Sequence, residues 1–224
     1  MSSDSDYVVI TGANRGIGLG LAKVYAGRGC KVVGICRNSS PELNAVADQV
    51  IDGVDVTDMK SVSLIRERLA GLSISLLINN AGILENERLG DIRYEDILRQ
   101  FEVNSVAPLK VSEALLPLMA PKAKLALITS RMGSMADNGS GGYYGYRMSK
   151  AALNAAGVSL ARDLSVNGIA VGIIHPGFVQ TDMVNHAGDI STDVSATRIS
   201  ERIDNLTLSN SGTFWHSNGE ILPW

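Results

Sequence analysis

Cysteine and histidine are scarce in this chain of 224 residues, which has two cysteines and three histidines. The cysteines, Cys30 and Cys36, flank an expected strand, and two such residues do not make a disulfide framework. We expect them to be reduced residues of the core or its edge. No histidine lies at ligand spacing from a cysteine, so the sequence predicts no metal site.

Long apolar runs and an excess of one charge are also missing. No apolar run approaches the ~20 residues that a membrane helix needs, and residues 1–6 are polar and acidic, unlike a secretory signal. The net charge of −3 gives no basic surface for nucleic acid or an anionic membrane. We therefore expect a cytoplasmic protein with neither nucleic acid nor membrane as a partner.

Strand and helix patterns alternate along the chain. Short apolar runs predict strands at 8–11, 31–35, 49–52, 75–79, 125–129, 170–174 and 213–215. Amphipathic segments predict helices at 18–28, 59–69, 95–115 and 146–164, and Pro108 should kink or split the third. The alternation predicts one α/β domain over 1–224, with a Rossmann-type, doubly wound parallel sheet of about seven strands and helices on both faces.

A glycine-rich run, Thr-Gly-Ala-Asn-Arg-Gly-Ile-Gly at 11–18, connects the first strand to the first helix. Gly12 permits a tight turn, while Gly16 and Gly18 remove side chains where a pyrophosphate and the neighbouring strand must come close. The helix N-terminus offers free N–H groups to phosphates. An ordinary glycine turn is the alternative, because a lone glycine motif is weakly specific.

Tyr146 and Lys150 are four residues apart and therefore share one face of a helix. A lysine ammonium at this distance can lower the tyrosine pKa. A tyrosine tuned in this way can pass a proton to or from an alcohol or ketone oxygen. Taken alone, the pair could also be an exposed helical contact.

With the glycine run, the Tyr-Lys pair and Asn-Asn-Ala-Gly at 79–82 in this order, the chain resembles the short-chain dehydrogenase/reductase family from about residue 8 onward. The runs 141–154 and 218–224 are similar to its carbonyl-reductase-like and C-factor-like members. The resemblance implies a nicotinamide-dependent oxidoreductase that acts on a carbonyl or alcohol, so the small-molecule partner should be of this class.

The end of the second predicted strand indicates the cofactor. In such folds an acidic residue there accepts the ribose hydroxyls of NAD, whereas this chain has Cys36 followed by Arg37. A guanidinium can bind a 2′-phosphate through two hydrogen bonds, and Arg15 adds a second cation. Both arginines could instead be solvated loop residues. We predict NADP(H).

The resemblance implies further cofactor contacts. Asp55 and Val56 match the family's adenine-contacting pair, although Asp55 could be a helix cap. The run at 79–82 matches the floor of the cofactor site, and Pro-Gly-x-x-x-Thr at 176–181 matches a nicotinamide contact. The predicted cofactor residues are Gly12, Asn14, Arg15, Gly16, Ile17, Gly18, Arg37, Asp55, Val56, Asn79, Ala81, Gly82, Tyr146, Lys150, Pro176, Gly177, Val179 and Thr181.

Four residues are candidates for the chemistry. Tyr146 is the acid/base, and Lys150 by resemblance also bonds the nicotinamide ribose. A serine that polarises the reacting oxygen is Ser130 by resemblance to the family's strand-end motif, with Ser134 as the rival nearer to Tyr146. Asn104 resembles the asparagine that completes a proton relay; otherwise it satisfies a local helix kink.

The segment 182–200 is polar and is expected to form a mobile lid over substrate. By resemblance we expect a homodimer or homotetramer, paired through the helix that carries Tyr146 and the long helix before it. Small residues at 151–157 would allow close approach, although they could equally pack on the sheet. The alternatives to an NADP(H)-dependent carbonyl reductase are a dehydratase or epimerase on the same fold, and a dinucleotide-binding regulatory protein without meaningful turnover.

Overall fold

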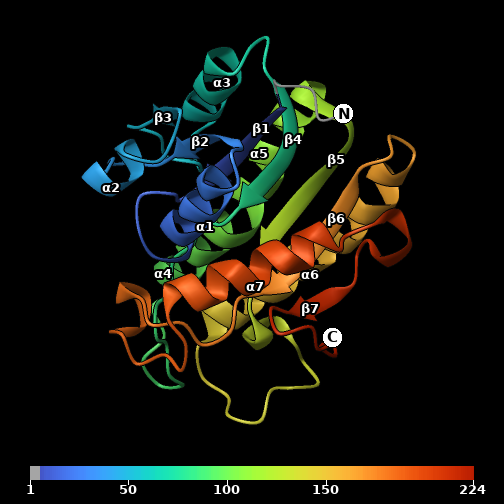
Figure 1. The fold of residues 1–224 in the computed structure, drawn as a ribbon. Coiled ribbons are helices and arrows are strands. Elements are labelled where there is room, and N and C mark those ends of the chain that lie inside the picture. The colour runs from blue at the N-terminus through green and yellow to red at the C-terminus, as the bar shows by residue number, and fades with distance from the viewer. Residues whose placement is uncertain (1–5) are drawn as a thin grey trace.

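A single parallel sheet organises the molecule, with its strands in the order β3-β2-β1-β4-β5-β6-β7 (Figure 1). The computed structural model describes residues 6–224. The predicted α/β architecture is confirmed, and most predicted strand boundaries are within two residues. The strands are β1 (Asp6–Thr11), β2 (Lys31–Ile35), β3 (Gln49–Ile51), β4 (Ser73–Asn79), β5 (Met119–Ile128), β6 (Ala170–His175) and β7 (Phe214–His216).

Helices cover both faces of the sheet (Figure 1). One face carries α1, α2 and α7, and the other carries α3, α5 and α6. The helices are α1 (Gly16–Gly27), α2 (Pro41–Asn44), α3 (Met59–Arg68), α4 (Tyr94–Phe101), α5 (Ala107–Leu115), α6 (Tyr144–Ser165) and α7 (Thr192–Asp204). Shorter helical turns are η1 (Glu102–Val106), η2 (Leu116–Leu118), η3 (Arg131–Gly133), η4 (Asp182–Val184) and η5 (Leu208–Asn210).

The period of two along each strand divides the core into two layers. In β1, Val8 and Ile10 pack with the α1 and α7 side, while Val9 packs with the α3, α5 and α6 side. All three are at most 3% exposed, which explains why the strands are continuous apolar runs.

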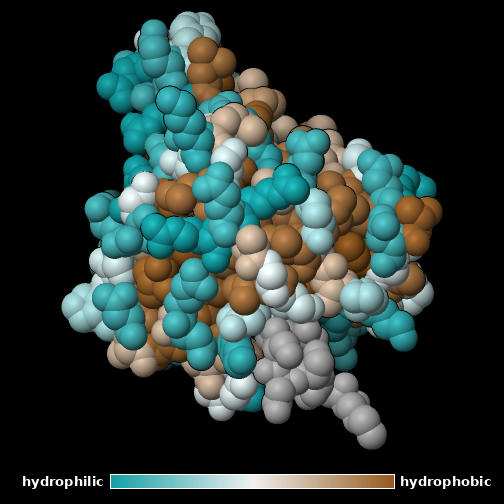
Figure 2. Space-filling model, turned by 90° about the horizontal axis from the view of Figure 1, so that it is seen from above, coloured by the Kyte–Doolittle hydropathy of each residue, from teal (hydrophilic) through white to brown (hydrophobic). Residues whose placement is uncertain are grey.

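The surface seen from above is mostly hydrophilic, with hydrophobic residues visible between the polar ones (Figure 2). Among residues 6–224, no helix is long and apolar enough to cross a membrane.

The predicted helix at 95–115 is divided, as the proline suggested, but the irregularity precedes the proline. The π-helical turn η1 lies between α4 and α5, and Pro108 occupies the first turn of α5. Proline has no N–H, so it cannot donate to the carbonyl four residues earlier, that of Asn104. The sequence thus places Asn104 in a widened turn.

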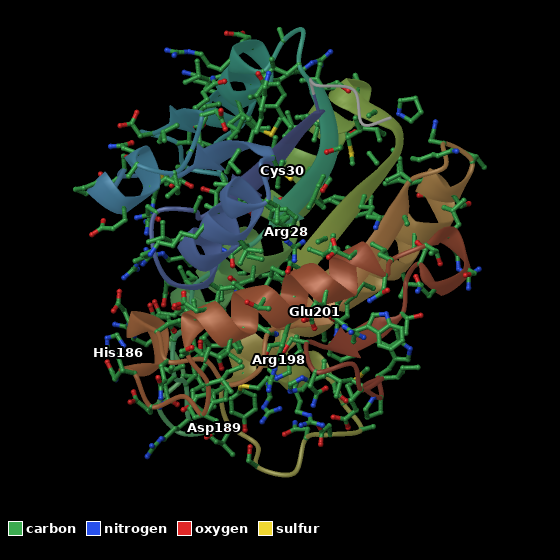
Figure 3. The ribbon with its side chains drawn as sticks, viewed as in Figure 1. Arg28, Cys30, His186, Asp189, Arg198 and Glu201 are labelled. Carbon is green, nitrogen blue, oxygen red and sulfur yellow. The ribbon has the colours of Figure 1, made fainter. Side chains whose placement is uncertain are left out.

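The segment 182–200, which the sequence predicts to be a lid, includes the first nine residues of a helix. Residues 192–200 belong to α7, whose buried Ala196 and Ile199 pack in the α1 layer. Arg28, which is labelled in Figure 3, joins the end of α1 to α7. Its guanidinium donates to Ser200 Oγ at 2.7 Å and to Asp204 Oδ2 at 3.0 Å. The part that lies outside a long helix is 182–191, which includes the labelled His186 and Asp189.

Candidate functional site

A cavity of about 640 Å³ opens at the carboxyl ends of the strands, where the strand order reverses between β1 and β4. This is where ligands bind in such sheets. Fourteen of the eighteen predicted cofactor residues line it: Gly12, Asn14, Arg15, Gly16, Ile17, Arg37, Asp55, Val56, Ala81, Gly82, Tyr146, Lys150, Pro176 and Thr181. The others, Gly18, Asn79, Gly177 and Val179, are not in its lining and lie close behind it.

The glycine run is shaped by close backbone contacts. A Cβ on Gly18 would lie 2.1 Å from the Gly12 carbonyl oxygen, and one on Gly12 would lie 2.9 Å from Ala81 Cα. Gly12 and Gly16 also have φ of +65° and +55°, a region that favours glycine. The first turn of α1 has no side-chain cap, since Arg15 at the N-cap position makes none. Its N–H groups therefore face the cavity as an anion site.

The two adjacent asparagines at 79–80 have different surroundings, and only the second lines the cavity. Asn79 is 2% exposed and donates to Ser112 Oγ, so it ties β4 to α5 behind the cavity. Asn80 lines the cavity and donates through Nδ2 to the carbonyls of Thr11 and Gly12, both at 3.1 Å. Asn80 was absent from the predicted set, although the same motif contained it.

The end of β2 carries the cation Arg37, with the carboxylates of Asp52 and Asp55 close by. Cys36 and the exposed Arg37 line the cavity here, opposite Asp55. Hydrogen bonds from Thr57 hold the pKa of Asp55 below its ordinary value, and Arg37 lowers it further. Asp55 therefore stays ionised near neutral pH. Arg15 pairs with Asp182 at 2.6 Å across the cavity mouth.

Tyr146 and Lys150 are both buried, and burial dominates their titration. Desolvation raises the pKa of Tyr146 to about 12, against a hydrogen bond with Ser130 that lowers it. Burial lowers the pKa of Lys150 to about 8. The Lys150 ammonium donates to the Ile128 carbonyl at 3.0 Å and lies 5.8 Å from the Tyr146 ring centroid. The expected lowering of the tyrosine pKa by the lysine is not found in this structure, where desolvation raises the pKa of Tyr146 and the group that lowers it is Ser130.

The two candidate serines have different surroundings. Ser130 follows β5, is 7% exposed and hydrogen bonds to Tyr146, while its Oγ accepts from the Met132 N–H. Ser134 is buried and its Oγ accepts from the Asp137 N–H, so it shapes the turn that follows η3. The geometry favours Ser130 as the serine beside the tyrosine.

Asn104 clamps the segment that follows β4. Its Oδ1 accepts from the Ile83 N–H and its Nδ2 donates to the Ile83 carbonyl, both at 2.9 Å. Its Nδ2 also donates to Ser149 Oγ in α6. A Cβ on Gly82 would lie 3.2 Å from Asn104 Oδ1 and 3.7 Å from Lys150 Nζ. The asparagine and the lysine thus converge on one glycine of the cavity wall.

The segment after β6 is braced behind the cavity. Pro176 and Thr181 line it, whereas Val179 is 4% exposed and pairs with Ile190 in an isolated parallel bridge. Gly177 has a φ of +95° and lies against Ile190. Gly177 and Val179 therefore shape this segment rather than contact the cavity.

One buried acid near the site, Glu87, is not marked by any motif of the sequence. It is 3% exposed, accepts the N–H of Gly145 at 3.2 Å and accepts from the amide of Gln100. Its carbonyl also accepts the Tyr143 N–H at 2.9 Å. Glu87 thus docks the first turn of α6, one residue before Tyr146. Its partner Gly145 is 58 residues away, so no local pattern could reveal the contact.

A parallel sheet with an uncapped glycine turn at its switch point, and a Ser-Tyr-Lys set on the same edge, defines a dinucleotide-binding domain of the oxidoreductase class. The model of the short chain dehydrogenase family matches residues 6–190. The chain belongs to this family.

Three comparisons place the chain within the family. It is 38% identical over 223 residues to 1-hydroxy-2-glutathionyl-2-methyl-3-butene dehydrogenase of Rhodococcus sp. (strain AD45), covering 97% of this chain and 99% of that protein. It is 42% identical over 154 residues to C-signal of Myxococcus xanthus, covering 67% and 93%. It is similar to the NADPH-bound carbonyl reductase from chicken fatty liver, with a TM-score of 0.88 and 29% identity over 98% and 99% of the chains.

Proposed function

We propose that the chain is an NADP(H)-dependent oxidoreductase that interconverts a carbonyl compound and a secondary alcohol. The observation that carries the proposal is the position of Tyr146 and Lys150 in one cavity with the glycine turn and Arg37. The NADPH-bound state of the similar carbonyl reductase supports the same cofactor. The substitution of Cys36 and Arg37 for an acid at the end of β2 favours a 2′-phosphate.

The residues present fit a dinucleotide. A Cβ on Gly18 would lie only 2.1 Å from the Gly12 carbonyl, so the turn is built for close backbone approach. The first turn of α1 would hold the pyrophosphate, Asp55 and Val56 would flank the adenine, and Arg37 would meet the 2′-phosphate. Arg15 would join Arg37 there on leaving Asp182, its partner in this structure. Lys150 would bond the nicotinamide ribose. When bound, NADPH supplies a hydride to the carbonyl carbon.

The side chains of this site would then bind the carbonyl oxygen of the substrate and supply its proton. Because the pKa of Tyr146 is about 12, the tyrosine carries its proton at neutral pH and can donate it to the oxygen as negative charge develops. Ser130 donates a hydrogen bond to the same oxygen. Lys150, whose ammonium lies 5.8 Å from the Tyr146 ring centroid, can return a proton toward it. Asn104 holds the segment after β4 against α6 through Ile83 and Ser149.

The test is NADPH consumption with a panel of ketones, aldehydes and quinones, run with NADH and with Tyr146→Phe in parallel. We expect turnover that prefers NADPH and falls at least ~100-fold in the variant. Tyr144→Phe is the matched control, since the same hydroxyl is removed two residues away. NADPH binding without turnover on any carbonyl or alcohol would contradict the reductase proposal.

The Rhodococcus relative extends the panel. Its name describes an alcohol that carries a glutathionyl group, so glutathione conjugates with a free hydroxyl should be tried in the oxidative direction with NADP⁺. We propose a bulky alcohol or carbonyl of this kind as one candidate substrate. Oxidation of the conjugate but not of a small secondary alcohol would support it.

A regulatory role is the second candidate, and the similarity to C-signal is the observation that favours it. The two roles separate at Tyr146. In the organism that encodes the chain, a regulatory protein would keep its biological effect in Tyr146→Phe, whereas an enzyme would lose it.

We also propose that the chain pairs with itself. Exposed apolar side chains lie on α4 and α5, with Leu98, Phe101 and Leu109 between 41% and 70% exposed. In α6, Gly157 packs on Ile173 of the sheet, while Ala155 is exposed. Light scattering should give twice or four times the chain mass, and Leu98→Lys should shift it to the monomer.

A further inference from the structure

The connection from η3 to α6, residues 134–143, lacks an apolar anchor. Residues 135–141 are all exposed, including Met135 at 74%. Gly141, Gly142 and Tyr143 have successive φ values of 65°, 65° and 53°, and the left-handed region disfavours a tyrosine. A segment of this kind keeps one shape only when polar contacts hold it.

Arg147 supplies contacts of this kind from the first turns of α6. Its guanidinium donates to Ser140 Oγ at 2.9 Å and to the carbonyls of Gly142 at 3.2 Å, Met132 at 3.4 Å and Gly141 at 3.4 Å. The side chain is half-buried. The planar fork of arginine suits several fixed acceptors at once, which a lysine ammonium does not reproduce.

One of these contacts, and the place of Arg147 in the chain, connect it to the reacting groups. Arg147 follows Tyr146 in α6, and its acceptor Met132 is the residue whose N–H donates to Ser130 Oγ at 3.1 Å. One guanidinium therefore connects the helix that carries the tyrosine to the turn that orients the serine. The backbone N–H of Arg147 also donates to the carbonyl of Tyr143, the residue with the left-handed φ, at 2.9 Å.

We propose that Arg147 is a positioning residue that fixes the segment 131–143 and, through Met132, the orientation of Ser130 relative to Tyr146. The segment then forms a rigid wall beside the reacting oxygen, so Arg147 also sets which substrates fit. This consequence for the reaction rests on the proposed function, whereas the fixing of the segment does not.

Hydrogen exchange tests the fixing without any substrate. We compare the wild-type chain with Arg147→Met, Arg147→Lys and the control Arg162→Met, which removes an exposed arginine of the same helix. Exchange in 131–143 should be at least ~10-fold faster in Arg147→Met, intermediate in Arg147→Lys and unchanged in Arg162→Met. Unchanged exchange in this segment, or an equal increase throughout the sheet, would overturn the proposal.

Kinetics test the consequence on the substrate that the wild type turns over. Displacement of Ser130 by about 1 Å should lower kcat/KM by ~10- to 100-fold, mainly through kcat for a small ketone and through both kcat and KM for a bulky one. The Kd for NADPH should stay within about twofold, because Arg147 does not line the cavity.

A kcat/KM equal to that of Arg162→Met would overturn the catalytic part. Absence of wild-type turnover would count against the proposed function, while hydrogen exchange would still decide whether Arg147 fixes the segment.

Discussion

Burial moves the pKa values of the two central residues apart, and this has a consequence for stability. The pKa of Lys150 falls from 10.5 to about 8. Between these pH values the unfolded chain holds the lysine proton and the folded chain does not, so the free energy of unfolding rises with pH across the window. Below pH 8 the fold carries the full cost of a buried ammonium, about 3 kcal/mol.

We therefore predict that Lys150→Met inactivates the protein and stabilises it. At pH 7 the gain should be about 2 kcal/mol, since the lost hydrogen bond to Ile128 offsets part of the relief. Urea unfolding at several pH values measures it, and the gain should shrink to zero or below by about pH 10.5. Lys23→Met, on the exposed face of α1, is the control. A gain that does not depend on pH would show that packing, not charge, causes it.

Gly18 should be the least replaceable residue of the glycine turn. Because its Cβ would collide with the Gly12 carbonyl, Gly18→Ala should destabilise the fold by about 2–4 kcal/mol and abolish dinucleotide binding. Gly27→Ala, at the other end of α1, meets nothing within 4 Å and should be neutral or stabilising by up to about 1 kcal/mol. Denaturant unfolding and NADPH titration measure both; NADPH binding retained by Gly18→Ala would contradict the assignment of the turn.

Sequence patterns reveal a site residue when its partners are close to it in the chain, and not when the tertiary fold supplies them. Gly12, Tyr146 and Lys150 belong to local patterns, and all three line the cavity. Asn79 and Asn80 are adjacent and chemically identical, and only the strand end decides which one turns inward to Ser112. Glu87 and Arg147 act through partners fixed by the tertiary fold, so their roles have no signature in the sequence.

At the scale of elements, burial explains both the successes and the failures of prediction. Strand β2 matches its predicted range because every residue but Lys31 is buried. Helix α7 is not among the predicted helices, because its buried face includes Ser195 and Ser200, and serines at these positions are typical of a polar loop. Its serines instead donate hydrogen bonds to carbonyls, Ser195 to Pro176 and Ser200 to Thr197. The helix therefore presents a partly polar face to α1.

The docking of α6 provides a test at this scale. Glu87→Ala leaves the Gly145 N–H without its buried acceptor and the Gln100 amide with only the Asp96 carbonyl at 3.3 Å, so it should cost about 2–3 kcal/mol of unfolding free energy. It should also lower kcat more than it weakens NADPH binding, because Tyr146 follows directly. Glu113→Ala, which removes an exposed acid of α5, is the control. A purely structural Glu87 would reduce stability and leave kcat of the folded protein unchanged.

At the scale of the whole molecule, the two core layers share the same strands. Val9 faces one layer while Val8 and Ile10 face the other, so neither layer can be lost alone and unfolding should be one cooperative transition. The cavity draws its lining from the ends of β1, β2, β4, β5 and β6. A ligand there contacts segments from most of the sheet, and its binding energy should stabilise the molecule as a unit.

This arrangement predicts a thermal shift that identifies the cofactor. NADPH at a hundredfold excess over its Kd should add about 2.7 kcal/mol to the free energy of unfolding, or roughly 5–10 °C in Tm for a chain of this length, without splitting the transition. Arg37→Ala should remove most of the advantage of NADPH over NADH, because the cation that meets the 2′-phosphate is gone. Arg66→Ala, an exposed arginine of α3, is the control. Equal shifts with NADPH and NADH in the wild type would show that Arg37 and Arg15 do not select the phosphate, and that the cavity binds only the parts that the two dinucleotides share.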